Sequence, residues 1–399
     1  MFFPFQGNTQ NAYLLNDTLK TSVGFDGNYL HNSTAFTNEF IKTFYLGKFI
    51  SQDIKDNVKR RLNGMNLFGQ EFNASLYGII HFDSVLHSAN HNLYIGISSK
   101  SLFKIYFPKD LFTVAFYGNK DFLGDTAYFN QLRSTYYKYQ SFDIGWLYQK
   151  HYSTVSLTSG IKLSIIKGKQ YFDVGMLNGY LFTSNSGNLI DVGAKSVFIQ
   201  SDTANPVFGG TGSSITFFTE IYASEKAKIH IEFNDIGFIT WNQNTLIQSG
   251  DTNYAFTGID LIEMINGSSS GINNDSIANY FFDTSEKKKT TTTLPAAIFV
   301  YYEQQVNEKW QLTLGLNQRL FFYYNTYFFG KINYKITPNL SPVLQLAYGG
   351  YGKLAVGLGI HAKIKHSWQL TLQTNNIEGL LLPKTYGGLS LQTGIIKQF

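Results

Sequence analysis

The chain contains 399 residues, of which 35 are phenylalanine, 27 are tyrosine and none is cysteine, and only 15% are charged. Ordinary soluble proteins carry more charge and fewer aromatic side chains over this length. A net charge of +5 is too small to indicate a nucleic-acid-binding protein, and the absence of cysteine excludes a disulfide scaffold and thiolate metal sites. The longest apolar run, residues 294–302, is about half of the roughly 20 residues that a membrane-spanning helix requires, so we expect no such helix.

The first third of the chain predicts strands interrupted by two short helices. Apolar residues recur every four positions within the segment 51–65, and Ser51 is placed to cap a helix there. The segment 108–119 begins with proline, which is favoured in the first turn of a helix. Residues 1–19 are interpreted as an N-terminal segment or a partial plug. The strands predicted in this third lie near residues 20–31, 68–82 and 91–105.

The middle of the chain continues the strand pattern less regularly. The region 242–293 departs from it, because it is polar and rich in glycine, serine and threonine. We interpret this region as an extramembrane excursion that holds one or two small helices. The strand-like segments of the middle lie near residues 142–148, 155–164, 170–183, 189–200, 212–224, 228–234 and 294–304.

The last ninety residues show the clearest alternation of apolar and polar positions. In the strand that begins at Trp310, leucines occupy one face while Gln311, Thr313 and Asn317 occupy the other, and the following strands up to residue 364 obey the same rule. These strands run to about ten residues or more, whereas an average strand has roughly five or six. Short turns separate them, which predicts an up-and-down antiparallel meander.

Aromatic residues at both ends of these strands indicate a membrane. Trp310 lies at one end of its strand, and the run FFYYNTYFF begins eleven residues later, at Phe321. On a tilted strand this separation corresponds to about 28 Å, close to the roughly 25 Å apolar band of an outer-membrane barrel. The pentapeptide WQLTL begins at Trp310 and again at Trp368, which predicts that both indoles lie at one height on the short-turn rim. The predicted membrane-interface residues are Trp310, Trp368, Phe321, Phe322, Tyr323, Tyr324 and Tyr327.

Strands with a lipid-facing side must close on themselves, because an open edge in hydrocarbon leaves backbone groups without hydrogen bonds. We therefore predict an all-β fold, a membrane-spanning up-and-down antiparallel β-barrel of about 14 strands (14–16), with residues 1–399 as one domain. The last strand, residues 387–399, ends on Phe399. A terminal aromatic residue resembles the signal by which outer-membrane barrels are recognised for insertion, although an aromatic-rich chain can also end on one by chance.

Positive charge is concentrated in the last quarter of the chain. From Trp310 to the end there are eight Lys or Arg residues and one acid, Glu378. The basic side chains form either a cationic wall that attracts anionic solutes, or ion pairs with lumenal acids such as Asp143 and Glu232 or with a plugging segment. The residues that the alternation assigns to this lumenal basic face are Arg319, Lys331, Lys335, His361, Lys363 and Lys365.

Two motifs match chemical signatures without the structural context that those signatures need. GSSSG, residues 267–271, fits the G-x-S-x-G pattern of hydrolases but lies in a low-complexity loop without a framing strand and helix. His81, Asp83, His87 and His91 are close in sequence, but their neighbours indicate a polar hairpin rather than converging metal ligands. We therefore expect no enzymatic activity, no metal and no other cofactor.

Several stretches resemble a family of uncharacterised outer-membrane barrels from Bacteroidota, which is related to FadL-like channels and to barrel subunits of the type IX secretion apparatus. The resemblance extends over most of residues 90–399 and implies a barrel in the bacterial outer membrane, without implying a substrate or catalytic residues. The residues that carry it are Ile236, Gly237, Phe238, Ile239 and Trp241, the run from Phe256 to Asp260, Leu294 and Pro295 before a strand with Tyr302, and Gly145, Gly160, Lys162 and Gly168.

Two functions are compatible with these observations. The first is a FadL-like or porin-like conduit for a small hydrophobic or anionic solute, in contact with outer-membrane lipid and lipopolysaccharide. The alternative is a non-transporting structural or docking subunit that binds other outer-membrane proteins; neither function involves nucleic acid. A lumen crowded by aromatic side chains and helices favours the docking subunit, whereas a continuous path or a lateral gap in the wall favours the conduit.

Overall fold

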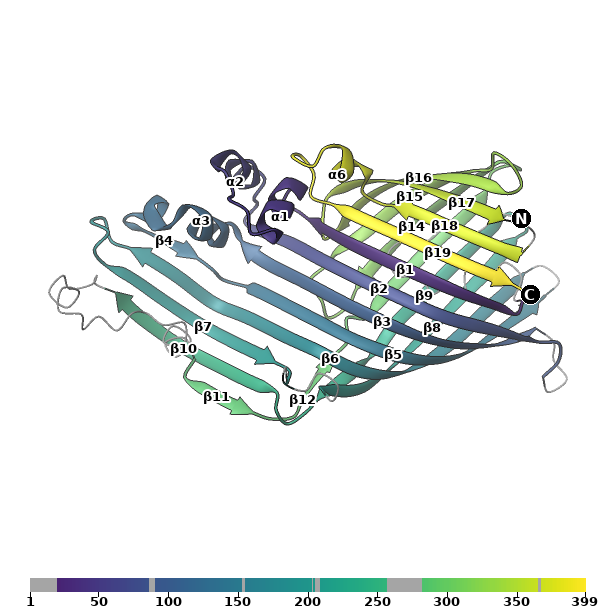
Figure 1. Cartoon of the computed structure of the whole chain (residues 1–399), viewed down its shortest axis with the longest axis horizontal. Helices are drawn as coiled ribbons and strands as arrows, with labels where there is room; N and C mark the ends of the chain where they lie inside the picture. The colour runs from purple at the N-terminus through teal and green to yellow at the C-terminus, as the bar shows by residue number, and fades with distance from the viewer. Residues whose placement is uncertain are drawn as a thin grey trace.

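The computed structural model describes residues 20–85, 90–152, 155–202, 204, 209–256, 282–364 and 367–399. In this part of the chain, nineteen strands form one sheet, and strand is by far the commonest secondary structure. Figure 1 shows the sheet as a long barrel whose strands run obliquely to its axis, with short helices at one end. The alternating sequence pattern therefore specifies an all-β fold, as predicted.

Fourteen of these strands form a closed antiparallel barrel, which confirms the predicted fold. Closure comes from the first and last barrel strands, which pair from Ser22 with Gln398 to His31 with Leu389. No edge of the barrel is therefore left open to lipid. In order around the barrel, the strands are β1 (Ser22–Ser33), β2 (Met65–Phe82), β3 (His91–Pro108), β5 (Leu132–His151), β6 (Ser156–Thr183), β8 (Gly210–Ser224), β9 (Ala227–Trp241), β13 (Ala297–Gln305), β14 (Trp310–Arg319), β15 (Asn325–Tyr334), β16 (Leu340–Gly350), β17 (Leu354–Ile364), β18 (Trp368–Thr374) and β19 (Leu389–Gln398).

The other strands extend the sheet beyond the barrel at the left-hand end of Figure 1. The long strand β6 pairs with β8 over its first half and with β7 over its second half, so the wall splits there. Two sequence predictions are corrected: 155–164 and 170–183 belong to one strand, and the segment 189–200 lies outside the barrel circuit. The additional strands are β4 (Asp125–Tyr128), β7 (Ile190–Gln200), β10 (Leu246–Phe256), β11 (Thr284–Lys287) and β12 (Thr290–Thr293).

The described part of the region 242–293 forms strands β10, β11 and β12. Residues 257–281, where the expected small helices could lie, are outside the described residues. Strand β10 pairs with β7 along its whole length, and β12 pairs with the end of β9. Strand β12 consists of four threonines and β11 begins with another, and threonine is a residue that favours strands. The GSSSG motif, at 267–271, lies outside the described residues.

The short helices lie at the end of the barrel where the connections are long (Figure 1). Both predicted helices are present, within 51–65 and 108–119, and the sequence reasoning missed α1, which Thr37 caps by accepting a hydrogen bond from the Phe40 backbone N–H. No helix in the described ranges is long and apolar enough to cross a membrane. The helices are α1 (Asn38–Tyr45), α2 (Gln52–Lys59), α3 (Lys109–Tyr117), the 3₁₀ helix η2 (Asn119–Phe122) and α6 (Ile377–Leu381).

The two faces of the barrel strands differ as the alternation predicts. On β14, Leu314 is 52% exposed, whereas the neighbouring Thr313 is buried. Exposed apolar side chains on a closed barrel identify its lipid-facing surface, because water would disfavour so many of them. Other outward-facing apolar residues include Phe25, Leu76, Ile97, Phe142, Ile165, Phe328, Ile332, Leu344, Leu346, Leu358, Leu372, Leu391 and Ile395.

The two WQLTL segments lie at the same rim. Both Trp310 and Trp368 begin a strand, β14 and β18, directly after a short connection. When the pairing of Trp310 is followed from strand to strand across β15, β16 and β17, it ends at Leu372 on β18. Leu372 is four residues beyond Trp368. Because the strands are tilted by about 40°, Leu372, four strands away from Trp310, lies about 12 Å higher along the barrel axis. Trp368 lies four residues below Leu372 on the same strand, which corresponds to about 10 Å along the axis. The two indoles therefore lie at nearly one height.

Candidate functional site: a closed lumen and an outer groove

An ion pair crosses the lumen near the long-connection end. Arg319, at the end of β14, donates from Nε to Glu71 Oε1 on β2 at 2.7 Å, and its Nη2 contacts the other carboxylate oxygen. The Tyr351 hydroxyl donates to the same Glu71 Oε1 at 2.6 Å. All three side chains are buried. A bidentate guanidinium–carboxylate pair with an additional donor is a well-satisfied arrangement for buried charge.

Aromatic side chains fill the space around this ion pair. Tyr106 and Tyr323 stack with ring centroids 4.7 Å apart, and the Lys104 ammonium lies 4.4 Å from the Phe322 ring centre. Tyr351 is packed so closely over Gly69 that a Cβ atom there would lie 2.1 Å from its ring. The surrounding buried cluster also contains Leu30, Leu67, Leu102, Tyr137, Tyr139, Ile166, Tyr171, Ile239, Trp241 and Leu294.

A polar cavity of about 50 Å³ adjoins the ion pair inside the barrel. Glu71 and Arg319 form part of its wall, together with the Lys100–Asp235 ion pair, whose Nζ–Oδ2 distance is 2.6 Å. One oxygen of the buried Asp143 lines this space without a hydrogen-bond partner. A cavity of this size holds a few water molecules.

A second charged cluster lies among β8, β9 and β13, on the lumenal side. His230 places its Nδ1 3.4 Å from Glu220 and its Nε2 3.2 Å from Glu232. Lys228 lies 3.5 Å from both Glu220 and Glu303. These side chains are all buried, and three acids are grouped with two bases, so most of the charge is paired within the cluster.

Amide side chains occupy the lumenal face of the C-terminal strands. Gln345 donates from Nε2 to the Tyr327 hydroxyl at 2.7 Å, and Gln373 donates to Gln345 Oε1 at 3.1 Å. Tyr327 and both glutamines are buried. Together with the ion pairs and the aromatic cluster, these side chains occupy much of the lumen within the described residues.

A groove of about 800 Å³ crosses the outer surface of the wall formed by β1, β2, β3, β5, β6 and β8. One edge of the groove is apolar, and its residues pair with one another from strand to strand; we call this edge the register row. The other edge carries smaller or polar side chains. The register row consists of Phe25, Leu76, Ile97, Phe142 and Ile165. The opposite edge consists of Ala74, Ser99, Gln140, Lys167 and Thr211.

The groove and the lumenal cavity lie back to back across the wall. Ser75 and Ser98 line both spaces, and Ser98 Oγ is 2.7 Å from Ser141 Oγ, another groove residue. The strands are paired without interruption here, with Ser75 opposite Ser98 and Ser98 opposite Ser141. The wall is therefore thin at this point but has no lateral gap.

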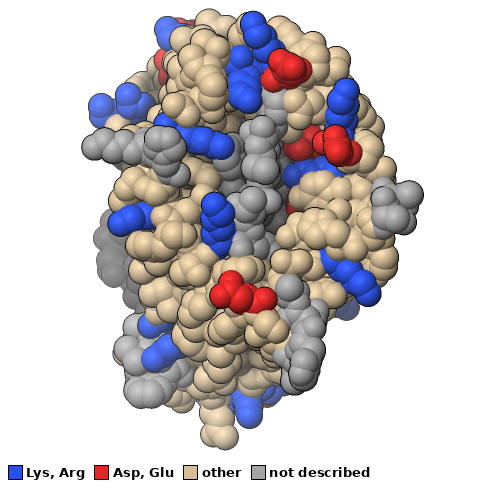
Figure 2. Space-filling view, turned by 90° about the vertical axis from the view of Figure 1, so that its right-hand side faces the viewer, with Lys and Arg blue, Asp and Glu red and all other residues tan. Residues whose placement is uncertain are grey.

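The predicted lumenal basic residues do not form a continuous cationic wall. Arg319 is paired with Glu71, and the buried Lys331 lies beside the Phe329 ring, 5.2 Å from its centre. His361 accepts or donates a hydrogen bond with Thr371 Oγ1 at 3.0 Å. Lys335 and Lys363 are partly exposed toward the short-turn end, and Lys365 lies outside the described residues. Figure 2 shows basic side chains spread around this end, with acidic side chains between them.

The predicted interface aromatics separate into two groups. Trp310, Trp368, Phe321 and Tyr323 are exposed, whereas Phe322, Tyr324 and Tyr327 are directed inward and pack in the lumen, so the interface assignment is wrong for these three. For Phe322 and Tyr324 the reason is the backbone, because Phe321 has φ of +59°, which reverses the alternation at the turn. Tyr327 faces inward by the ordinary alternation of β15, on the face opposite to the exposed Phe328. Phe399 is exposed, and its backbone N–H donates to Thr21 at 2.9 Å.

The histidine-rich segment forms the base of a hairpin. His81 Nδ1 bonds to Asn92 Oδ1 at 3.0 Å, and His91 stacks on Tyr148 with ring centroids 4.7 Å apart. His87 lies outside the described residues. Among the residues that the structure describes, no three or more His, Asp or Glu side chains are grouped to hold a metal ion.

Outside the barrel, α2 and α3 are joined by charged contacts. The Tyr117 hydroxyl donates to Asp56 Oδ1 at 2.6 Å, and this hydrogen bond holds the pKa of Asp56 below its usual value. Lys59 lies 2.8 Å from Asp121 and lowers the pKa of that carboxyl in the same way. These contacts fix the helical end of the barrel at neutral pH.

The sequence reasoning missed Glu71 and Tyr351, which complete the cross-lumen ion pair. Glu71 occupies an inward-facing position of the predicted strand 68–82, and an acid at such a position is a recognisable signal. Its partner is 248 positions away in the sequence, and only the closed circuit brings the two together. Tyr351 lies in a three-residue turn, where no periodicity indicates its direction.

The fold defines a 14-stranded transmembrane β-barrel, and buried ion pairs and aromatic side chains lie in its lumen. The chain belongs to the family of unknown function DUF5723, which matches residues 8–372. None of the curated proteins matches it.

Among solved structures, a similar fold occurs in the TodX deltaS2S3 mutant, a monoaromatic hydrocarbon channel with 11% identity and a TM-score of 0.50, over 98% of this chain and 95% of that chain. The Pseudomonas putida toluene transporter TodX has 10% identity and a TM-score of 0.45, over 98% and 93%. A Pseudomonas aeruginosa FadL homologue has 10% identity and a TM-score of 0.43, over 98% and 93%. The predicted fold, a closed all-β barrel of fourteen strands, is therefore shared with the first of these structures.

Proposed function

We propose that the protein is a bacterial outer-membrane conduit for a small, largely apolar solute, and that it is closed at rest. The observation that carries this proposal is the outer groove lying back to back with the lumenal cavity, with Ser75 and Ser98 shared between them. The apolar row of the groove suits a hydrocarbon part of a solute, and its polar edge suits a small polar group. The similarity in fold to a monoaromatic hydrocarbon channel supports a largely apolar solute.

A solute of this kind fits the charges better than an anionic one. The cavity wall contains Asp26, Glu71, Asp143 and Asp235 against Lys100, Lys162 and Arg319, so acids are not outnumbered. Arg319, the strongest base of the predicted basic face, is already neutralised by Glu71. Passage would require local opening of the strand pairing at Ser98 and displacement of the cross-lumen ion pair.

Uptake into vesicles tests this proposal. The solute is a radiolabelled monoaromatic hydrocarbon, and the vesicles carry lipopolysaccharide in the outer leaflet to slow passive entry. Ala74→Trp and Ser99→Trp place indoles in the groove, and Ala362→Trp, on the outer face of β17, is the matched control. We expect the groove variants to lose uptake and the control to keep it. Equal uptake by all three would refute the groove as the entry.

The alternative function, a docking subunit of a larger outer-membrane assembly, is favoured by one observation. The lumen is crowded by aromatic side chains and ion pairs, as expected for a barrel that does not transport. The sequence resemblance to type IX secretion barrels of Bacteroidota would imply this alternative, and it stays a prediction. Its test is mild-detergent purification after crosslinking in cells: stable co-purification of other outer-membrane proteins, without any uptake in vesicles, would favour docking.

A further inference from the structure

Four large apolar side chains are exposed at the end of α1 and in the loop that follows it. Their exposed fractions are 61% for Phe44, 83% for Tyr45, 54% for Leu46 and 88% for Phe49. We call these four residues the α1 patch. Contiguous exposed apolar residues of this size mark a contact with a partner or a membrane.

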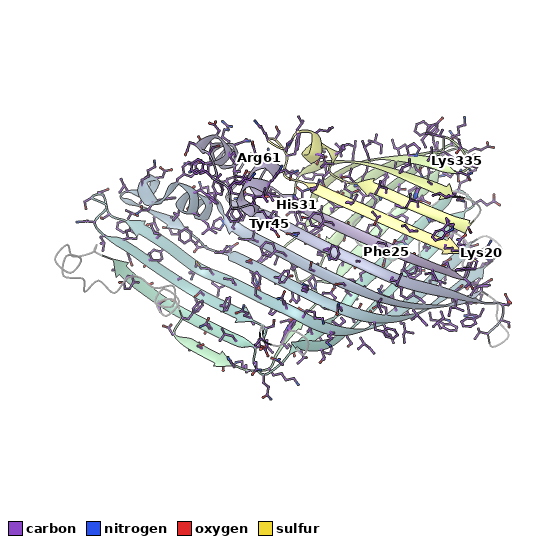
Figure 3. All side chains as sticks on the ribbon, viewed as in Figure 1. Lys20, Phe25, His31, Tyr45, Arg61 and Lys335 are labelled. Carbon is purple, nitrogen blue, oxygen red and sulfur yellow. The ribbon has the colours of Figure 1, made fainter. Side chains whose placement is uncertain are left out.

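The α1 patch lies beside the outer face of the barrel at the seam between β19 and β1. Asn38, at the start of α1, bonds through Oδ1 to His31 Nε2 at 3.1 Å, and through Nδ2 to the carbonyl oxygens of Gly379 and Gly388 at 2.8 Å. The Tyr29 hydroxyl bonds to Nδ1 of the same His31 at 3.0 Å, so Tyr29 lies beside the start of α1, and Tyr45 is the last residue of that helix. Figure 3 shows Tyr45 beside His31, with Phe25 at a separate position along the same strand.

The lipid-facing surface of the barrel continues up to this seam. Tyr29 pairs in register with Leu391, which is half exposed on the outer face. Phe25, in the apolar register row, is four residues from Tyr29 on the same face, which corresponds to about 13 Å along the strand. The α1 patch therefore lies just beyond the hydrocarbon-facing rows, at the depth where lipid headgroups begin.

The charges around the α1 patch are basic. Lys42 and Lys48 flank it and are exposed, and no acid occurs between Phe40 and Gln52. Aromatic residues combined with lysines are typical of segments that lie in a membrane interface. A second apolar element adjoins the same seam, because α6 exposes Leu380, Leu381 and Leu382 next to the loop that Asn38 binds.

We propose that the α1 patch inserts into the interface of a lipid leaflet with phosphate-bearing headgroups, with Lys42 and Lys48 facing the phosphates. The occupant is lipid rather than a protein partner, because the patch is continuous with the lipid-facing wall and carries positive charge. The helix would then fix the height of the long-connection end of the barrel relative to the membrane. This proposal does not depend on whether the barrel transports a solute.

Fluorescence quenching by lipid tests the insertion directly. The chain has no cysteine, so Tyr45→Cys and Phe49→Cys can each carry a single bimane label in the full chain. Leu391→Cys is the lipid-facing reference, and Asp53→Cys, on the exposed side of α2, is the water-facing control. In phosphatidylglycerol nanodiscs with brominated acyl chains, we expect strong loss of fluorescence at 45, 49 and 391, and little at 53. Labels at 45 and 49 that resist quenching, as at 53, would overturn the proposal.

Two comparisons separate the lipid from other occupants. With Lys42→Gln and Lys48→Gln together, we expect weaker quenching at 49 in phosphatidylglycerol than in the parent, and no difference in phosphatidylcholine. An equal effect in both lipids would contradict the role of the phosphates. If the label at 45 were shielded from water-soluble quencher in native outer-membrane vesicles but not quenched by brominated lipid in nanodiscs, a protein partner would cover the patch, and the proposal would fail.

Discussion

Arg319 and Glu71 form a bidentate ion pair although their strands, β14 and β2, are seven strands apart in either direction around the barrel. A circular barrel of fourteen strands at a tilt near 40° has a backbone diameter of about 28 Å, and an Arg–Glu pair bridges at most about half of that distance. The wall must therefore be drawn inward where the pair forms. The ion pair acts as a cross-brace, and it also closes the lumen.

Removing one member of this pair should destabilise the barrel strongly. Glu71→Leu leaves Arg319 buried without its partner, which costs about 3–5 kcal/mol of unfolding free energy, whereas removing both charges together costs less. Guanidinium titration of the protein in lipid vesicles, followed by tryptophan fluorescence, measures the difference. Lys195→Ala breaks the exposed Lys195–Asp251 pair and should change stability by less than about 1 kcal/mol. A Glu71→Leu effect as small as this control would contradict the bracing role.

Gly69 tests the same brace without changing any charge. An added methyl group at this position would lie 2.1 Å from the Tyr351 ring, so Gly69→Ala must displace the tyrosine from Glu71. We expect a loss of about 1–3 kcal/mol from this overpacking. Gly175→Ala is the matched control, because nothing lies within 4 Å of its added atom. Thermal unfolding of the two variants should separate them clearly; identical midpoints would mean that Tyr351 is free to move aside.

The lipid-facing assignment predicts a dependence on depth. Leu314 lies in the middle of β14 and is 52% exposed, so Leu314→Arg should cost about 2–4 kcal/mol in a bilayer. Val306 is also exposed but lies in the short-turn connection, where the same substitution should cost about 0–1 kcal/mol. Equilibrium folding into vesicles at increasing guanidinium concentration gives both values. Equal costs at the two positions would place the membrane elsewhere on the barrel.

The helical end of the barrel should loosen in acid. The pKa of Asp56 is lowered from 3.8 in the folded protein, chiefly by the Tyr117 hydrogen bond, so its contribution is complete above that value and disappears as the pH falls through the lower folded pKa. Hydrogen exchange of α2 should therefore accelerate, relative to its intrinsic rate, between pH 5 and pH 3. In Tyr117→Phe we expect weaker protection already at pH 5 and a smaller acid effect. An unchanged profile in that variant would exclude the hydrogen bond as the cause.

The sequence predicted those features of the fold that depend on alternation. Period-two patterning and the aromatic ends of the strands were sufficient for a closed barrel of fourteen strands, and the repeat at Trp310 and Trp368 was sufficient for a common rim. The split of β6 could not be predicted, because the choice of β7 or β8 as its neighbour depends on pairings over long sequence distances. The helix α1 was missed although it has the same eight-residue length as α2, because its aromatic and β-branched residues Phe40, Ile41, Phe44 and Tyr45 are equally typical of strands.

The candidate site was less predictable for a similar physical reason. The alternation of apolar and polar positions is sufficient to predict that Arg319 and Lys331 face inward. The partner of Arg319, however, depends on which strands face each other across the lumen. Phe322 was assigned to the membrane interface because the sequence gives no sign of the positive φ at Phe321, which reverses the alternation at the turn. Tyr327 was assigned there from the aromatic composition of its segment, although the alternation of β15 places it on the face opposite to the exposed Phe328. The groove is invisible in the sequence, because it arises where small side chains such as Ala74 and Ser99 fall side by side on adjacent strands.

Single-channel recording in planar bilayers tests most directly the claim that the barrel is a conduit closed by the Arg319–Glu71 pair. The full chain is compared with the double variant Arg319→Ala and Glu71→Ala, after both are shown to be folded by their resistance to unfolding in detergent. We predict that the parent protein is mostly silent, with rare openings, and that the double variant conducts in frequent, discrete steps. Silence of both proteins over the same voltage range would contradict the conduit and leave the docking subunit as the better account.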